Sequence, residues 1–199
     1  FVPGPVMPPV SLGSHRVGTL VCEDLWDEGY AYHPAADLTA AGADLIVCLS
    51  ASPYRRSVLA QRLYHARRQA CPVVYVNAVG AQDDLIFDGR SFVTNGEGAL
   101  VARLPGFEEA IQVVELDAGA ELSVVDEDDE VETLYRALVL GIRDFTRKNG
   151  VPRIFLGLSG GVDSSVVAVL AAEAVGSANV TGVAIPSRYT DPRSTSSAE

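Results

Sequence analysis

Long hydrophobic runs and cysteines are both scarce in this chain of 199 residues. No stretch approaches the roughly 18 consecutive apolar residues that a membrane-spanning helix needs, so we expect no membrane contact. The three cysteines, with no basic and then apolar leader before them, argue against a disulfide framework and favour a reducing compartment, by default the cytoplasm. The composition, 48% hydrophobic and 21% charged, is ordinary for a globular protein and excludes a disordered or collagen-like chain.

Residues spaced to bind a metal ion are missing as well. The histidines His15, His33 and His65 are scattered, and there is no Cys-x-x-Cys or His-Glu-x-x-His motif, so we expect no zinc site built by the protein. A group of arginines lacks interleaved aromatic residues and an overall basic face, which favours a solvated helix surface or an interdomain contact over nucleic-acid binding. The group consists of Arg55, Arg56, Arg62, Arg67 and Arg68.

Negative charge is present, but it is concentrated in one segment. The net charge is −11, and residues 108–132 hold eleven Asp or Glu and no Lys or Arg, which leaves fifteen acidic and fifteen basic residues elsewhere. Residues 117–130 show no periodic apolar pattern, so we interpret them as an acidic linker between a domain over 1–116 and another over 131–199. The chain starts without Met and stops without a terminating element, so we expect an internal fragment.

Strand and helix patterns alternate ahead of the linker, an order that is typical of an α/β layer. Short β-like pieces at 90–94, 99–103 and 110–116, separated by Asn-Gly and Pro-Gly turns, predict hairpins that close the edge of this domain. The earlier elements are predicted strands at 17–22, 44–49 and 73–76 and predicted helices at 34–41 and 57–70.

A second α/β domain begins after the linker. Apolar residues recur at helical spacing from Val131 to Phe145, with acidic residues at the start and Arg147 and Lys148 in the last turn, which predicts an amphipathic helix. A strand at 153–158, a helix at 164–175 and a strand at 180–185 are predicted next. One such helix and two strands cannot cover both faces of a parallel sheet, so we expect this domain to be incomplete.

The sharpest local feature is a glycine-rich loop between the predicted strand and helix of the second domain. Its sequence, Leu-Gly-Leu-Ser-Gly-Gly-Val-Asp-Ser-Ser, covers residues 156–165. Adjacent glycines allow close approach of a ligand, and loop amides with a helix N-terminus suit an oxyanion or phosphate. The pattern is neither a P-loop nor the dinucleotide fingerprint. The alternative is a plain turn with Ser164 as N-cap, and Asp163 is either a capping carboxylate or a magnesium ligand.

The run Ser-Gly-Gly-Val-Asp-Ser at 159–164 resembles the pyrophosphate loop of the ATP pyrophosphatases. The segment 185–190, Ile-Pro-Ser-Arg-Tyr-Thr, is similar to the Met-Pro-Ser-Arg-Tyr-Ser segment of NAD synthetases, with Ile185 in place of Met. The resemblance implies an adenine-nucleotide α-hydrolase-like parallel-sheet domain that uses ATP and Mg²⁺, with Asp163 as metal ligand; Arg188 either meets ATP or caps the strand. The implied ATP-binding residues are Gly157, Leu158, Ser159, Gly160, Gly161, Val162, Asp163, Ser164, Ile185 and Arg188.

Cys22 follows a predicted strand and precedes a polar, turn-like segment, where a thiol could be exposed. A lone cysteine is more often a small buried apolar residue, and this is our interpretation of Cys48 and Cys71. For Cys22 we favour a nucleophile over a buried structural residue, because residues 20–26, Leu-Val-Cys-Glu-Asp-Leu-Trp, resemble the nucleophile segment of the nitrilase-like glutaminase domain of glutamine-dependent NAD synthetases. Similar matches to that family occur at Ala51-Ser52-Pro53-Tyr54, residues 74–89 and Ser91-Phe92.

This second resemblance implies the C-terminal part of a nitrilase-like α-β-β-α sandwich. It implies that Cys22 attacks the side-chain amide of glutamine to give a thioester and ammonia, with Glu23 and Trp26 lining the pocket. Ser52 would help to hold the α-amino and carboxylate groups of glutamine.

The chain departs from the glutaminase family at two points. The catalytic Glu and Lys of the family lie upstream of the nucleophile, and the only lysine here is Lys148, beyond the linker. The basic residue expected six positions after Ser52 is Val58, so we assign the carboxylate of glutamine to Arg55, although Arg56 is also near.

Together the resemblances imply an enzyme that makes NAD from deamido-NAD, ATP and glutamine. ATP would adenylate the nicotinate carboxylate, pyrophosphate would leave into the loop at 159–164, and ammonia would attack the acyl-adenylate. A homo-oligomer is expected. The alternatives are another ATP-pyrophosphatase amidotransferase, against which the Pro-Ser-Arg-Tyr segment argues, and a catalytically silent remnant or scaffold.

Overall fold

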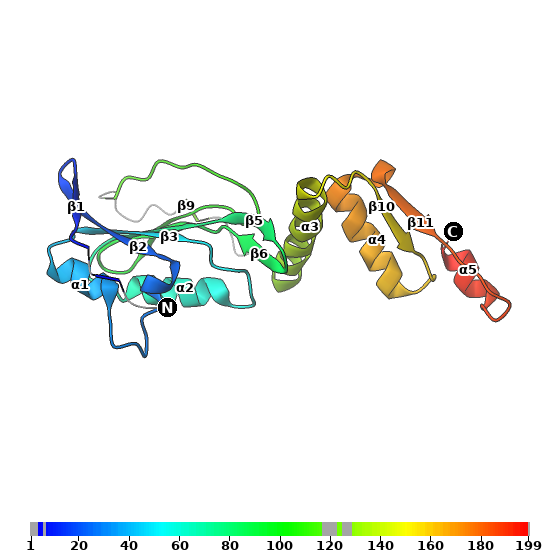
Figure 1. Ribbon diagram of the computed structural model, residues 1–199, viewed down its shortest axis with the longest axis horizontal. Helices are drawn as coiled ribbons and strands as arrows, with labels where there is room; N and C mark the ends of the chain where they lie inside the picture. The colour runs from blue at the N-terminus through cyan, green and yellow to red at the C-terminus, as the bar shows by residue number, and fades with distance from the viewer. Residues whose placement is uncertain (1–3, 6, 117–122, 125–128, 199) are drawn as a thin grey trace. The chain divides into compact units, whose positions relative to one another are not determined.

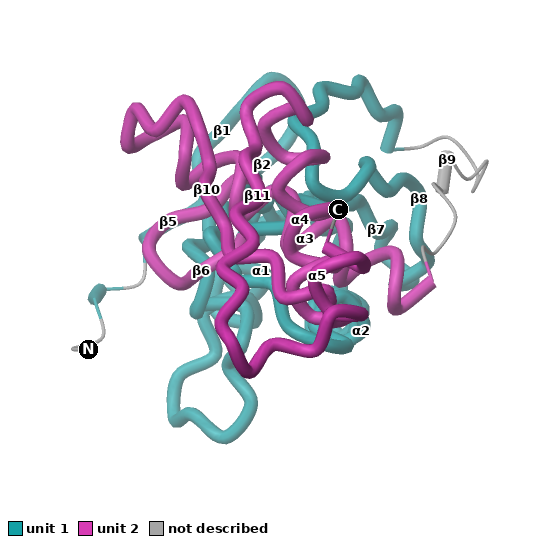
Figure 2. The backbone as a smooth tube through the Cα atoms, turned by 90° about the vertical axis from the view of Figure 1, so that its right-hand side faces the viewer, with its two compact units in different colours: residues 1–79, 87–127 teal, residues 80–86, 128–199 magenta. Residues whose placement is uncertain are grey.

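The computed structural model describes residues 4–5, 7–116, 123–124 and 129–198, with the backbone alone at 123–124. The chain forms two compact units, residues 1–79 with 87–127, and residues 80–86 with 128–199 (Figure 2). Most of the predicted linker, at 117–122 and 125–128, lies outside the described residues. No helix in the described ranges combines the length and apolar character needed to cross a membrane.

The first unit is built on a mixed sheet with the order β1-β2-β3-β4-β7-β8-β9 (Figure 1). Its centre is parallel: β2 pairs with β3 and β3 with β4, and the crossover connections that parallel pairs need contain α1 and α2. The bounds are β1 Val10–Leu12, β2 His15–Val21, α1 Pro34–Ala40, β3 Leu45–Ser50, α2 Val58–Arg67, β4 Val73–Asn77, β7 Phe92–Thr94, β8 Leu100–Arg103 and β9 Ser123–Val124.

The helices α1 and α2 lie on one side of this sheet, where they cover a hydrophobic core (Figure 1). Successive side chains of a strand point to opposite faces, so every second residue of each central strand enters that core. On the opposite face Val21, Leu49 and Val76 pair in register across β2, β3 and β4 and are 66%, 51% and 42% exposed. The core includes Leu20, Leu38, Ile46, Cys48, Leu63, Ala66, Val73, Tyr75 and Phe92.

The second unit contains a parallel pair of strands, β10 (Ile154–Gly157) and β11 (Val180–Val183), connected through α4 (Val162–Val175). The helix α3 (Glu130–Lys148) packs on α4 through Val139, Leu170 and Ala174. Asp129 caps the start of α3 by accepting a hydrogen bond from the Val131 N–H at 2.9 Å. The predicted helix–strand–helix–strand order of this segment is therefore confirmed.

Most of a hairpin from the middle of the chain, residues 80–86, belongs to the second unit. It is formed by β5 (Val79–Gln82) and β6 (Leu85–Asp88), and residues 80–86 pack with α3. The Ala81 N–H donates to Asp144 Oδ2 at 2.8 Å, and Lys148 Nζ donates to the Ala81 carbonyl. A Cβ on Gly80, whose φ is +135°, would lie 2.8 Å from the same carboxylate, so glycine allows this close approach.

Several segments differ from the sequence-based predictions. The pieces at 90–94 and 99–103 form the antiparallel pair β7 and β8, as predicted, but 110–116 has no regular structure. It forms no ladder hydrogen bonds, and only Val114 and Leu116 pack on the sheet, against a core that includes Val93. The strand β1, the helix α5 (Pro192–Ala198) and the hairpin at 79–88 were not predicted, and neither was β9, which falls within the predicted linker.

Candidate functional site

Cys22 lies where β2 ends and the short helix η1 (Cys22–Leu25) begins. Its φ is +46°, in the left-handed region that residues other than glycine rarely adopt. Such strain costs on the order of 1–3 kcal/mol and persists only where the surroundings enforce it, which is typical of functional sites. Here Asp24 Oδ2 accepts a hydrogen bond from the Val21 N–H at 2.8 Å, so the chain is fixed on both sides of the thiol.

A cavity of about 510 Å³ opens beside Cys22. It brings together the predicted nucleophile and all four residues predicted to bind glutamine. Two further residues, Glu28 and His65, were not predicted, and no motif in the sequence marks them. The lining residues are Cys22, Glu23, Trp26, Glu28, Ser52, Pro53, Arg55 and His65.

Ser52 is held in this cavity by a buried polar network. Its N–H donates to Asn77 Oδ1 at 2.8 Å, and its carbonyl accepts from Arg62 Nη2 at 2.7 Å. Arg62 also forms an ion pair with Asp88 at 2.9 Å, and both side chains are fully buried. The expectation that Arg62 lies on a solvated surface or between domains is therefore wrong. Its place beside Leu63 and Ala66 on the buried face of α2 is the signal that could have shown this.

Two other lining residues contact the ring of Trp26. The Arg55 guanidinium carbon lies 5.7 Å from the ring centroid, within cation–π range. The His65 imidazole contacts the same ring, with centroids 4.8 Å apart. His65 is 8% exposed, and burial lowers its pKa, which keeps the imidazole neutral near pH 7 even though Glu28 opposes the shift.

The two acidic side chains of the cavity each accept a hydrogen bond from a tyrosine hydroxyl. Tyr30 donates to Glu23 at 2.8 Å, and Tyr64 donates to Glu28 at 3.3 Å. Among the described lining residues Arg55 is the only Lys or Arg. The cavity thus offers one cation, two anions and a thiol, which suits a substrate that itself carries both charges.

The other two cysteines have the buried, structural role that was expected of them. Cys48 is fully buried in the core under the sheet, and burial raises its pKa to about 11. Cys71 is 6% exposed, and burial likewise raises its pKa. Neither thiol is a readily formed thiolate at neutral pH.

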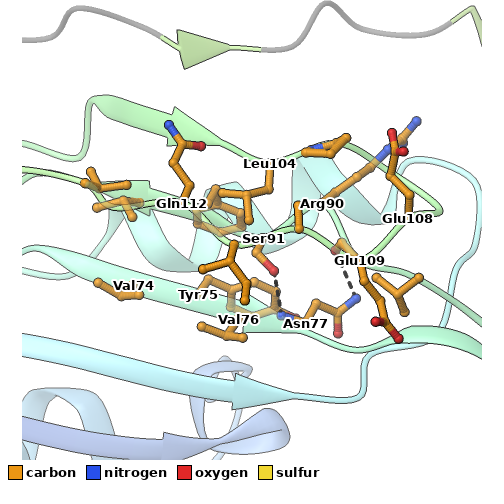
Figure 3. Close-up of a pocket in the computed structure, with 18 of the residues that line it drawn as sticks. Val74, Tyr75, Val76, Asn77, Arg90, Ser91, Leu104, Glu108, Glu109 and Gln112 are labelled. Carbon is orange, nitrogen blue, oxygen red and sulfur yellow. Dashed lines mark hydrogen bonds between the residues drawn. The ribbon is translucent and has the colours of Figure 1, made fainter.

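A second cavity, of about 540 Å³, lies between β4, β7 and the chain at 104–116 (Figure 3). Asn77 is at its base, where the Asn77 N–H donates to Ser91 Oγ at 3.0 Å and the Asn77 side-chain amide donates to the Gly89 carbonyl at 3.2 Å. This cavity shares no lining residue with the one beside Cys22.

The glycine-rich loop joins β10 to α4, as predicted, and its residues are largely exposed. The helix begins at Val162 with Gly161 as N-cap, so the alternative with Ser164 as N-cap is wrong. Ser164 instead lies in the first turn, where its hydroxyl donates to the Gly161 carbonyl at 3.0 Å. Gly160 has a φ of +76°, and a Cβ there would collide with the backbone of Ser194.

The residues predicted to meet ATP lie at one edge of the second sheet. Because β10 and β11 are parallel neighbours, the loop after β10 and residues 185–188 after β11 both follow carboxyl ends of strands. Arg188 lies over the Tyr189 ring at 4.8 Å, and Ile185 is 82% exposed. Asp163 is exposed in the first turn of α4.

A strained cysteine on a parallel α/β sheet, followed by a second α/β unit with a glycine-rich loop, is the arrangement expected of a hydrolase domain joined to a nucleotide-binding one. Residues 1–122 match the model of the carbon-nitrogen hydrolase family, and the chain belongs to that family. Residues 134–199 match the model of the NAD synthase family. The predicted fold class, part of a nitrilase-like sandwich followed by the start of an NAD synthetase domain, is confirmed.

Individual relatives contain both segments in one chain. The sequence is 45% identical to the glutamine-dependent NAD(+) synthetase of Rhodobacter capsulatus, over 96% of this chain and 36% of the relative, and 40% identical to that of Synechocystis sp., over 90% and 35%. A solved glutamine-dependent NAD+ synthetase from Acinetobacter baumannii, in complex with ADP, aligns with a TM-score of 0.83 at 32% identity, over 96% of this chain and 37% of that one. The chain thus spans about a third of the length of these relatives.

Proposed function

We propose that this chain is part of a glutamine-dependent NAD(+) synthetase, a ligase. Residues 1–116 would belong to the glutaminase domain, 117–130 to a linker and 131–199 to the synthetase domain. The observation that carries the proposal is the cavity in which strained Cys22 meets Glu23, Trp26, Ser52 and Arg55. The order of the two matched families and the 45% identity to a named synthetase support it.

In the glutaminase half, Cys22 would be the nucleophile. Its sulfur gives up its proton and attacks the side-chain amide carbon of glutamine, the C–N bond breaks as the leaving nitrogen takes a proton and departs as ammonia, and water then hydrolyses the thioester to glutamate and the free thiol. Arg55 would pair with the α-carboxylate, and Ser52, fixed by Arg62 and Asn77, would hold the same end of the substrate. Glu23 and Trp26 would shape the wall.

In the synthetase half, the loop at 157–164 would bind the phosphates of ATP. The positive φ of Gly160 and the exposed N-terminus of α4 provide backbone donors and a dipole that suit phosphate oxygens, so these residues fit the group. ATP would supply adenylation, which converts the nicotinate carboxylate of deamido-NAD into a mixed anhydride with AMP, and attack by ammonia on its carbonyl carbon would then release AMP. Ile185 and Arg188 would complete the ATP site at the adjacent strand end.

Asp163 would hold Mg²⁺ together with phosphate oxygens. The described residues contain no group of three His, Cys, Asp or Glu side chains that could hold a metal ion by themselves. The ion would neutralise phosphate charge. A cytoplasmic location is also proposed, supported by three unpaired cysteines, and a homo-oligomer stays a prediction.

The test uses the full-length protein that contains this chain, assayed for NAD with either glutamine or ammonium as nitrogen donor. We expect Cys22→Ala to abolish the glutamine-dependent reaction and to leave the ammonium-dependent one. Cys71→Ala is the matched control, since that thiol lies away from the cavity lining.

Three results would contradict the proposal. Loss of the ammonium reaction in the Cys22 variant would show that the two halves do not divide the labour as described. Absence of both reactions in the wild type would favour the scaffold, and a different amidated product would favour another ATP-pyrophosphatase amidotransferase.

A further inference from the structure

The charges of the Cys22 cavity leave one end of the proposed substrate without a dedicated partner. Free glutamine carries an α-carboxylate and an α-ammonium group, whereas a simple amide carries neither. The positive charge of Arg55 suits the α-carboxylate, whereas Ser52 provides only a neutral hydroxyl for the α-ammonium group. An ammonium group that leaves water needs a carboxylate or several hydrogen-bond acceptors in compensation.

Glu28 lines the cavity with an exposed carboxylate. Among the described residues it forms no ion pair, and its one hydrogen bond, at 3.3 Å, comes from the neutral hydroxyl of Tyr64. The neighbouring His65 does not neutralise it either, because burial lowers the pKa of His65. Asp27, the adjacent acid in the chain, is already paired with His33 at 3.0 Å.

The presence of Glu28 in the same cavity lining as Arg55 also fits the ammonium end. Arg55 and His65 both contact the Trp26 ring, and Glu28 is close enough to His65 to influence its titration. Cation and anion thus line the same cavity, Arg55 on the Trp26 ring and Glu28 near His65. Glu23 differs, since it adjoins Cys22 in the chain and its carboxylate accepts a shorter bond, 2.8 Å, from Tyr30.

We propose that Glu28 binds the α-ammonium group of glutamine while Arg55 binds its α-carboxylate. This assignment rests on the proposed glutaminase function and makes Glu28 a determinant of specificity. The cavity would accept side-chain amides of free α-amino acids and discriminate against amides that lack the amino group.

The experiment pairs a change in the protein with a change in the ligand. The full-length protein and its Glu28→Gln variant are assayed for ammonia release from glutamine and from 4-carbamoylbutanoate, which is glutamine without its α-amino group. We expect the variant to lose about 10- to 100-fold in kcat/KM for glutamine, the range of a charge-assisted hydrogen bond. Its kcat/KM for 4-carbamoylbutanoate should hardly change, so the preference for glutamine collapses.

Controls separate this proposal from the wider function. Glu97→Gln, in an exposed turn away from the cavity, should keep the wild-type preference. Glu28→Asp, which keeps the charge, should retain part of it and serves if the Gln variant is unstable. Equal losses on both substrates, or a selective loss in Glu23→Gln instead, would overturn the assignment. If Cys22→Ala still hydrolyses glutamine, the proposed function fails rather than the role of Glu28.

Discussion

Arg62 and Asp88 form the residue pair on which the geometry of Ser52 depends most. Both are fully buried, and Arg62 bonds the Ser52 carbonyl and hydroxyl as well as Asp88. We expect Arg62→Met to lower the free energy of unfolding by about 3–5 kcal/mol, because it leaves a buried carboxylate without a partner. The KM for glutamine should also rise, since Ser52 loses two of its anchors.

Urea unfolding and glutaminase kinetics of the full-length protein measure both effects. Arg67→Met, on an exposed position of the same helix, is the matched control and should change stability by less than about 0.5 kcal/mol. Arg62→Met with Asp88→Asn should recover part of the stability, because no unpaired charge is then buried. A stable Arg62 single variant with unchanged KM would show that the pair does not support Ser52.

At the scale of single residues, the sequence identified the predicted reactive and binding residues better than the residues that hold them in place. Cys22 and its neighbours could be predicted because a contiguous motif carries them. Arg62, Asp88 and Asn77 are brought together from three elements, and their pairing depends on the tertiary fold. Glu28 and His65 belong to no local pattern, so only the cavity reveals them.

Among the elements, the contact of the β5–β6 hairpin with α3 depends on the ionised carboxylate of Asp144. Burial by itself would raise the pKa of Asp144, but the Ala81 N–H, Lys148 and Arg147 lower it from 3.8 to about 2. A pKa that is lower in the folded state means that the ionised group stabilises the fold above about pH 4. This contribution disappears as the pH falls through about 2.

We therefore expect Asp144→Asn to destabilise the protein at pH 6 and to have a smaller effect at pH 3. Urea unfolding of both proteins at the two pH values measures this difference, and exchange of the Ala81 amide reports the hairpin directly. Glu132→Gln, at the exposed start of the same helix, is the control. A destabilisation that is equal at both pH values would contradict the role of the charge.

Elements with strong periodicity were predicted well, and those without it were missed. The helix α3 combines an apolar stripe, an acidic start and a basic last turn, and all three signals agree. Residues 110–116 contain apolar residues typical of a strand, but Ile111 and Val113 are 101% and 92% exposed. Apolar composition indicates a strand only where a partner strand is available, which the sequence does not show.

On the scale of the whole molecule, two motifs at distant positions decided the fold class. The nucleophile segment and the glycine-rich loop each require a parallel strand followed by a tight turn, and the structure has this arrangement in both units. Which unit holds the hairpin at 80–86 could not be predicted, because it follows from contacts with Asp144 and Lys148 that lie more than sixty residues away.

The contacts of Lys148 also affect the activity expected of the 199-residue chain by itself. Its only lysine, Lys148, is engaged with Asp144 and Ala81 in the second unit, and the lining of the Cys22 cavity contains no lysine. A thiol attacks an amide poorly without a group that takes its proton and passes one to the leaving nitrogen. We therefore expect the isolated chain to release no ammonia from glutamine, measured with a coupled ammonia assay beside Cys22→Ala. Ammonia release that depends on Cys22 would show that residues already in this cavity, with Glu23 and His65 as the first candidates, are sufficient for the proton transfers.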